Sequence, residues 1–309
     1  MRYGLPYMGS KNTIANWVIG HLPPSGHFYD LFCGGCAVTH AAMLSGKWEK
    51  FTINDINFMP KFFIDAVAGK YRDEKRWISR DDFFKLKDTD PYVAVCWSFG
   101  NNMRDYLYCK EIEPWKKALH YARLFGDMSL LREFGIEGDG SSSNILKHYE
   151  EYRHKYIDWF PDNRHCGELQ RLQRLQRLES LESLQRLQRL QRLQSLESIK
   201  GIASLEGFSG DYQDVVIEPN STVYCDIPYK GTGAYSTKYK FDYERFYEWA
   251  LSRDYPVYVS EYQMPEGFSM IAERYKTVNM TSGGGISNGA VEKIFVQDKF
   301  VDNFKATLF

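Results

Sequence analysis

The segment FYDLFCGGC, residues 28–36, begins the stretch of sequence that decides the fold. An apolar strand is expected at residues 28–32, followed by a glycine-containing turn at residues 33–36. Residues 37–44 are rich in small side chains and are expected to form a helix, and FTIND at residues 51–55 is expected to form a strand that ends on an acid. This order of strand, glycine turn, helix, strand and acid is typical of the first βαβ unit of a nucleotide-binding sheet.

The strand pattern returns only near the C-terminal end of the chain. Further strands are predicted at residues 221–225, 256–260, 275–280 and 293–297, with a helix at residues 241–252. Between the two strand-rich regions, charged, aromatic and helix-forming residues are mixed. The sequence therefore predicts an α/β fold with a split sheet domain, residues 1–65 and 205–309, and a mainly helical insertion, residues 66–204.

The insertion ends in a repeat, residues 169–199, with an aliphatic residue at every third position and Gln-Arg, Glu-Ser or Gln-Ser between. These residues are strong helix formers without Gly or Pro, so a helix is predicted. Each three-residue step leaves the next aliphatic residue about 60° behind, so the apolar stripe winds around the helix and a regular coiled coil is disfavoured. An extended or solenoid form with three residues per turn is the alternative. The repeat is interpreted as a spacer, with phosphate tracking by its arginines as the second hypothesis.

Composition restricts the class of protein. The net charge of −1 does not indicate a nucleic-acid partner, so such a partner would need a local basic face. Six cysteines at irregular spacing suit reduced thiols, and no metal site is expected. The sequence has no long apolar run and no charged-then-apolar N-terminal segment, so it predicts a soluble, cytoplasmic protein without membrane contact.

The segment VYCDIPY, residues 223–229, carries the most informative candidate chemistry. An apolar strand runs into Asp226, and Pro228 and Tyr229 follow. A carboxylate at the end of a strand can accept hydrogen bonds from an amino group, and a rigid turn can hold an aromatic ring for stacking on a flat base. The pattern favours a planar base with an exocyclic amine as the substrate.

Three upstream clusters add a candidate ligand site. Tyr7 and Lys11 stand just before an N-terminal helix, and the Gly34-Gly35 turn after Asp30 lets backbone approach a ligand closely. Asp55 ends the second strand, where a carboxylate often binds ribose hydroxyls.

In this order, the motifs resemble those of the Dam-type (alpha-class) DNA N6-adenine methyltransferases. The matches are Tyr7, Gly9 and Lys11 to Tyr-x-Gly-x-Lys, Phe32 and Gly34 to Phe-x-Gly-x-Gly, Asn54-Asp55 to Asn-Asp, and Asp226, Pro228 and Tyr229 to Asp-Pro-Pro-Tyr. Two positions depart from the family pattern: Cys36 replaces a glycine of the turn, and Ile227 replaces the first proline.

The resemblance implies a Rossmann-like S-adenosylmethionine-dependent methyltransferase sheet with an inserted target-recognition region. It implies transfer of a methyl group to adenine N6 in a specific duplex DNA sequence, with base flipping. The residues it implies for catalysis are Asp226, Ile227, Pro228 and Tyr229, and those for cofactor binding are Tyr7, Lys11, Asp30, Phe32, Gly34, Gly35 and Asp55. Candidate DNA contacts in the insertion are Arg104, Lys110, Lys116, Lys117 and Arg123.

Double-stranded DNA is the expected partner, with a separate restriction endonuclease for the same site as a candidate second partner. A monomer of bacterial or phage origin is expected. The alternatives are N4-cytosine methylation, a catalytically weak relative that binds DNA or the cofactor, and a helical scaffold assembled through the repeat.

Overall fold

The structure, a computed structural model, describes residues 3–110, 113–135, 189–230, 241–276 and 290–302. The chain forms two compact units. The first comprises Met1–Arg72 and Arg192–Phe309, and the second comprises Asp73–Gln191.

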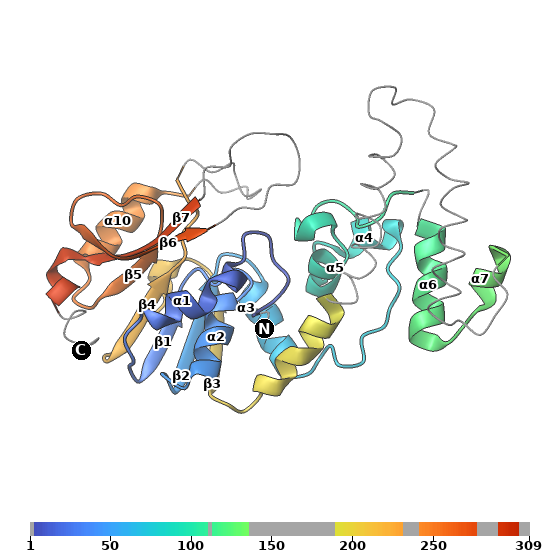
Figure 1. Ribbon diagram of the computed structural model, residues 1–309, viewed down its shortest axis with the longest axis horizontal. Coiled ribbons are helices and arrows are strands. Elements are labelled where there is room, and N and C mark those ends of the chain that lie inside the picture. The colour runs from blue at the N-terminus through green and yellow to red at the C-terminus, as the bar shows by residue number, and fades with distance from the viewer. Residues whose placement is uncertain (1–2, 111–112, 136–188, 231–240, 277–289, 303–309) are drawn as a thin grey trace, which may run out of the picture. The chain divides into compact units, whose positions relative to one another are not determined.

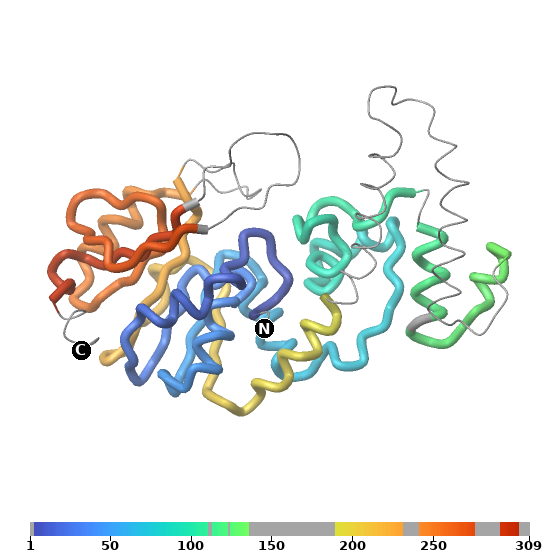
Figure 2. The backbone as a smooth tube through the Cα atoms, in the orientation of Figure 1, coloured from blue at the N-terminus to red at the C-terminus, as the bar shows by residue number. Residues whose placement is uncertain are grey.

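A seven-stranded sheet forms the centre of the first unit, in the order β3-β2-β1-β4-β5-β7-β6. Its strands are β1 (His27–Asp30), β2 (Lys50–Asp55), β3 (Ser204–Ser209), β4 (Ser221–Cys225), β5 (Val257–Ser260), β6 (Phe268–Lys276) and β7 (Ala290–Gln297). Strands β3, β2, β1, β4 and β5 are parallel, and β7 runs antiparallel to both of its neighbours. Strands from both ends of the chain thus share one sheet, as the blue and the orange to red parts of Figures 1 and 2 show. The predicted α/β fold is confirmed.

Two strand predictions need correction. The strand predicted at residues 275–280 is β6, which begins at Phe268 and ends at Lys276, while residues 277–280 lie outside the described part of the chain. Strand β3 was not predicted at all, because its side chains are mostly exposed and show no apolar alternation.

Alternating side chains of the central strands build the core. Tyr29 and Leu31 from β1 and its end, together with Val223 and Val259, pack against Phe246 of helix α10 (Tyr243–Ser252). Asp242 is the N-cap of α10, and its side chain accepts a hydrogen bond from the Arg245 N–H. The other helices of this unit are α1 (Ala15–Gly20), α2 (Ala37–Ser45) and α3 (Met59–Val67), with 3₁₀ turns η1 (Lys11–Thr13), η3 (Leu196–Ile199), η4 (Tyr212–Asp214) and η5 (Asp298–Phe300).

The described part of the second unit is helical around an aromatic core. Its elements are α4 (Arg80–Leu86), α5 (Pro91–Cys96), η2 (Phe99–Asn101), α6 (Glu113–Phe125) and α7 (Ser129–Glu133). The Trp77 ring meets the Trp97 ring edge-on at 5.1 Å and stacks parallel to the Tyr108 ring at 5.9 Å. Such ring pairs add about 0.5–1.5 kcal/mol beyond their buried area, so they help to hold these short helices together.

The C-terminal end of the repeat is described from residue 189, and it is helical over residues 189–195. The helix then tightens into η3, where Leu196 and Ile199 are buried. A 3₁₀ helix has three residues per turn, so side chains three apart share one face. The change to a 3₁₀ helix therefore keeps Leu196 and Ile199 on one buried face, whereas in an α-helix residues three apart would be offset by about 60°. Residues 169–188 lie outside the described part of the chain.

None of the described helices combines the length and the hydropathy needed to cross a membrane.

Candidate functional site

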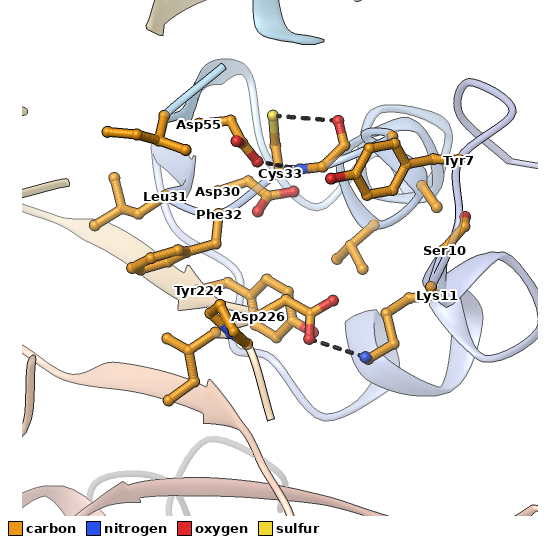
Figure 3. Close-up of a pocket in the computed structure, with 18 of the residues that line it drawn as sticks. Tyr7, Ser10, Lys11, Asp30, Leu31, Phe32, Cys33, Asp55, Tyr224 and Asp226 are labelled. Carbon is orange, nitrogen blue, oxygen red and sulfur yellow. Dashed lines mark hydrogen bonds and ion pairs between the residues drawn. The ribbon is translucent and has the colours of Figure 1, made fainter. Parts of the chain in front are cut away.

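A cavity of about 1170 Å³ lies where β1, β2 and β4 end, within the first unit. From β1 the chain continues to β2 on one side of the sheet, and from β4 it continues to β5 on the other side. The gap between β1 and β4 is therefore a topological switch point, where α/β sheets commonly bind ligands. All the residues predicted for catalysis and cofactor binding line this cavity: Tyr7, Lys11, Asp30, Phe32, Gly34, Gly35, Asp55, Asp226, Ile227, Pro228 and Tyr229. Figure 3 shows the two carboxylates Asp30 and Asp55 with the turn on one side and Asp226 with Lys11 on the other.

The glycine turn is in direct contact with the N-terminal motif. A Cβ on Gly35 would lie 2.6 Å from the Tyr7 Cβ, and one on Gly34 would lie 3.0 Å from the Tyr7 ring. The Leu5 N–H also donates to the Gly35 carbonyl at 2.6 Å. The turn therefore needs glycine so that the segment carrying Tyr7 and Lys11 can lie against it.

Cys36 departs from the family pattern and keeps the backbone conformation that favours glycine. Its φ of 54° lies in the left-handed region, and the residue is the N-cap of α2. A side chain in this conformation costs on the order of 1 kcal/mol. The conformation of the turn is thus retained at a modest cost.

Cys33 and Cys36 form a Cys-x-x-Cys pair, which the expectation of irregularly spaced cysteines overlooked. The Cys36 Sγ lies 3.4 Å from the Cys33 Sγ. Burial raises the pKa of both thiols, most strongly for Cys33, so they are protonated at neutral pH. Buried thiols of this kind are structural rather than nucleophilic.

Asp30 is a buried carboxyl with one oxygen that none of the described residues satisfies. Its Oδ2 accepts a hydrogen bond from the Thr39 hydroxyl at 2.7 Å, whereas Oδ1 has no partner in the described part of the chain. Burial, aided by the nearby charges of Asp226 and Asp55, raises the pKa of Asp30 to about 7. A buried polar atom without a partner is costly, so Oδ1 is a position where a bound ligand would be stabilised.

Asp55 closes the turn from β2. Its Oδ2 accepts a hydrogen bond from the Gly34 N–H at 2.9 Å, and its Oδ1 accepts one from the Asn57 N–H at 3.3 Å. Burial raises the pKa of Asp55, and these backbone donors lower it in part. The carboxylate is thereby fixed at the cavity wall.

Lys11 lies beside the Asp226–Tyr229 segment rather than at the glycine turn. Its Nζ is 2.9 Å from Asp226 Oδ1 and 4.3 Å from the centre of the Tyr229 ring. Burial raises the pKa of Asp226, the Lys11 ammonium lowers it, and the carboxylates of Glu292 and Glu261 raise it. Lys11 thus favours the ionised form of a carboxyl that burial would otherwise neutralise.

Glu292 is a site residue that the sequence motifs did not assign to the site. It stands on β7, lines the cavity, and accepts a hydrogen bond from the Tyr229 hydroxyl at 2.6 Å. Its sequence signal is one acid in the otherwise mostly apolar segment AVEKIFVQ. A single acid in a strand does not identify a partner 63 residues earlier in the chain, so the signal was too weak.

The predicted DNA contacts of the second unit divide by exposure. Arg104, Lys110 and Lys117 are exposed, whereas Lys116 is buried in the core of the unit. Lys116 is therefore unsuited to contact phosphates, and that prediction is wrong in this structure. The side chain of Arg123 lies outside the described part.

The arrangement suits a cofactor with a charged end and a nucleoside end. A glycine cradle, fixed carboxylates and the aromatic wall of Phe32 and Tyr212, whose rings are 5.1 Å apart, surround one cavity. Among the described residues, no group of three or more His, Cys, Asp or Glu side chains is arranged to hold a metal ion.

Comparison with known proteins finds a family match over part of the chain. No curated protein matches the chain. Residues 7–127 match the family described as D12 class N6 adenine-specific DNA methyltransferase. The match includes the N-terminal motif, the glycine turn and Asp55, and the seven-stranded sheet is consistent with a Rossmann-like methyltransferase fold. By this match, residues 7–127 are similar to a family of N6 adenine-specific DNA methyltransferases, which supports a DNA adenine methyltransferase activity for the chain.

Proposed function

We propose that the chain transfers a methyl group from S-adenosylmethionine to the N6 amino group of an adenine in a specific duplex DNA sequence, after that base has been flipped out of the helix. The observation that carries the proposal is that the glycine turn and the Asp226–Tyr229 segment line the same cavity. When bound, S-adenosylmethionine supplies an electrophilic methyl group. The residues that would hold it are Tyr7, Asp30, Phe32, Gly34, Gly35 and Asp55.

Asp226 and Ile227 would act on the amino group. Adenine N6 is a weak nucleophile because its lone pair is delocalised into the ring. Hydrogen bonds from the amino group to the Asp226 carboxylate and to the Ile227 backbone carbonyl would favour an sp³-like nitrogen and stabilise the positive charge that develops on it. The carbonyl is present whatever the side chain, so isoleucine in place of proline does not remove this acceptor. Lys11 would keep Asp226 ionised and would thus support the catalytic segment from the N-terminal motif.

Tyr229 would stack on the flipped base. Extrusion of a base from the duplex costs a few kcal/mol, and stacking on an aromatic ring returns about 1–3 kcal/mol. Pro228 restricts the backbone next to the tyrosine.

The second unit, Asp73–Gln191, would recognise the target sequence through exposed basic residues such as Arg104, Lys110 and Lys117. The enzyme would act as a monomer, and a restriction endonuclease that cleaves the same unmodified sequence would be its partner in the cell.

The test is transfer of a radiolabelled methyl group from S-adenosylmethionine to several unmodified genomic DNAs, followed by nucleoside mass spectrometry. We expect N6-methyladenine with the wild-type protein and a loss of at least about 100-fold with Asp226→Ala, because a positioned acid–base or charge-stabilising group contributes on this order. Absence of incorporation with the wild-type protein on all DNAs would sink the proposal. N4-methylcytosine as the product would contradict the assignment of the base.

A further inference from the structure

Glu292 places a carboxylate in a buried part of the site, where a charged group is destabilising. The residue is 5 % exposed, and its Oε2 contacts the Tyr229 hydroxyl at 2.6 Å and lies 4.0 Å from the Lys11 Nζ. A buried carboxylate is destabilising unless hydrogen bonds and an opposite charge compensate it. The two groups that compensate the Glu292 carboxylate, the Tyr229 hydroxyl and the Lys11 ammonium, both belong to the proposed active site.

The Tyr229 ring is fixed from several sides. The Tyr262 ring meets it edge-on with 4.5 Å between ring centres, and the Lys11 ammonium lies over its face. Burial and the neighbouring carboxylates raise the pKa of Tyr229, so the hydroxyl stays protonated and donates to Glu292. This hydrogen bond fixes the hydroxyl end of the ring, the end farthest from the backbone.

A second buried carboxylate holds the backbone that follows the ring. Glu261, directly after β5, accepts a hydrogen bond from the Lys230 N–H at 2.5 Å and another from the Tyr262 N–H. Glu261 thus fixes the main chain at the end of the segment, whereas Glu292 acts on the Tyr229 side chain. Both carboxylates come from the β5–β7 half of the sheet, at the point where the two strands pair.

We propose that Glu292 is a positioning residue for methyl transfer: it holds the Tyr229 ring, through the hydroxyl, in the orientation in which the target adenine stacks. This inference rests on the proposed function. A displacement of about 1 Å in a positioning contact can lower a rate by about 100-fold. Loss of the tether should therefore lower kcat more than it changes the KM for S-adenosylmethionine, because the glycine turn and its carboxylates are left intact.

A double-mutant cycle tests the tether. Tyr229→Phe removes the hydroxyl and keeps the ring, and Glu292→Ala removes the acceptor. We expect each variant to lower kcat by about 10- to 100-fold. In the Tyr229→Phe background, Glu292→Ala should lower kcat by less than about threefold, because the tether is already absent. Multiplicative effects of the two substitutions, or wild-type kcat in Glu292→Ala, would overturn the proposal.

Glu292→Gln provides a rescue, because the amide oxygen still accepts a hydrogen bond from the hydroxyl at nearly the same size. We expect its kcat at neutral pH to stay within about threefold of wild type. Glu292→Gln also provides a test if Glu292→Ala does not fold. In that case, a kcat for Glu292→Gln as low as that of Tyr229→Phe would overturn the proposal that Glu292 positions Tyr229.

The acidic limb of the rate profile gives an independent readout. The titratable groups around Asp226 are Lys11, Glu292 and Glu261, with Asp30 at the end of β1 as a further nearby carboxyl, and the negative charge of Glu292 raises the pKa of Asp226. Glu292→Gln should move the acidic limb to lower pH, and an unmoved limb would contradict contact between these charges in the working enzyme.

The matched control is Glu273→Gln on β6, which makes the same charge change at an exposed position of the same sheet. We expect wild-type kcat and an unmoved acidic limb for this control. Absence of methyl transfer by the wild-type protein would refute the proposed function itself, whereas equal activity of wild type, Glu292→Ala and Tyr229→Phe would refute only the role of Glu292.

Discussion

The carboxyl group of Asp30 makes the free energy of unfolding depend on pH. Its pKa is raised from an unfolded value of 3.8 to about 7, chiefly by burial. Between these two pH values, the folded chain holds a proton that the unfolded chain has released, so the free energy of unfolding falls as pH rises from about 4 to about 7. About three pKa units correspond to a loss on the order of 4 kcal/mol.

Asp30→Asn should remove this pH dependence, because the amide cannot ionise and can still accept the Thr39 hydrogen bond. At pH 8 we expect the variant to be more stable than wild type by up to about 4 kcal/mol, and at pH 4 to differ little. Urea unfolding at the two pH values measures the difference. The exposed Asp81→Asn is the control. A constant difference across the pH range would show that Asp30 is ionised in the folded protein.

Ile227 has a structural role where the family has proline. Its side chain is buried in the cluster that includes Val223, Cys225 and Phe246. We expect Ile227→Ala to lower the free energy of unfolding by about 2–4 kcal/mol through the cavity it leaves. Because the backbone carbonyl is kept, kcat below the melting temperature should stay within a fewfold of wild type. Denaturant unfolding and methyl-transfer assays check the two outcomes, and a large fall in kcat with unchanged stability would contradict them.

Among single residues, the sequence predicted those whose type is required by the backbone conformation or by the proposed reaction. Gly34 and Gly35 were found because the close approach of Tyr7 leaves no room for a Cβ. Glu292 was missed because its contact with Tyr229 depends on strand pairing, which places β7 beside β5. The position of Lys11 beside Asp226 is likewise a property of the fold and is not visible in the motif.

Among the elements, the end of the repeat shows how a three-residue period is used. Leu190, Leu193, Leu196 and Ile199 are all buried. Two of the repeat arginines donate hydrogen bonds to backbone carbonyls: Arg189 to Cys96 and Ser98, and Arg192 to Tyr3 and Gly4. At these two positions the guanidinium groups serve internal contacts, which does not favour phosphate tracking.

Leu193→Ala should lower the free energy of unfolding of the first unit by about 2–5 kcal/mol, since this fully buried leucine would leave a cavity. The matched control is Gln191→Ala, at an exposed position of the same helical segment, for which we expect a change within about 0.5 kcal/mol. Thermal or urea unfolding measures both. Equal stability of the two variants would show that the end of the repeat does not pack in solution.

The elements that the sequence predicted best are buried and have apolar neighbours on both sides. The strands expected at 28–32, 51–55, 221–225 and 293–297 all overlap observed strands. Strand β3 escaped prediction because it lies at the sheet edge, exposed, and contains Gly207, where a Cβ would lie 2.6 Å from the Ile64 side chain. A strand shaped by close approach to a helix carries little apolar pattern of its own.

At the scale of the whole molecule, the chain leaves the first unit after Arg72 and returns to it at Arg192. The Arg72 guanidinium donates to Glu197, and the Gln194 side chain donates to the Arg72 carbonyl at 2.6 Å. The two points at which the chain leaves and re-enters the first unit are therefore tied together. That the second unit recognises the target sequence is a prediction.

Deletion of Leu172–Arg177, two repeat units, tests the interpretation of the repeat as a spacer. We expect the same DNA sequence to be methylated, with a change in rate of less than about tenfold, because the buried end of the repeat is retained. Sequencing of modified bases in DNA from cells that express the variant reports base, position and site together. A different methylated sequence would show that the repeat takes part in recognition.

The ammonium group of Lys11 over the Tyr229 ring has a consequence for selectivity. A base that stacks on the ring face covered by Lys11 must exchange with this cation. Breaking the cation–π interaction costs about 0.5–2 kcal/mol, and stacking of the base contributes about 1–3 kcal/mol, so stacking alone leaves little net gain. A base whose amino group also donates to the Asp226 carboxylate gains about 1.5–3 kcal/mol more. Under the proposed function, the Lys11 ammonium would therefore compete with the base for the ring face and would discriminate against bases that can stack but cannot donate a hydrogen bond to Asp226.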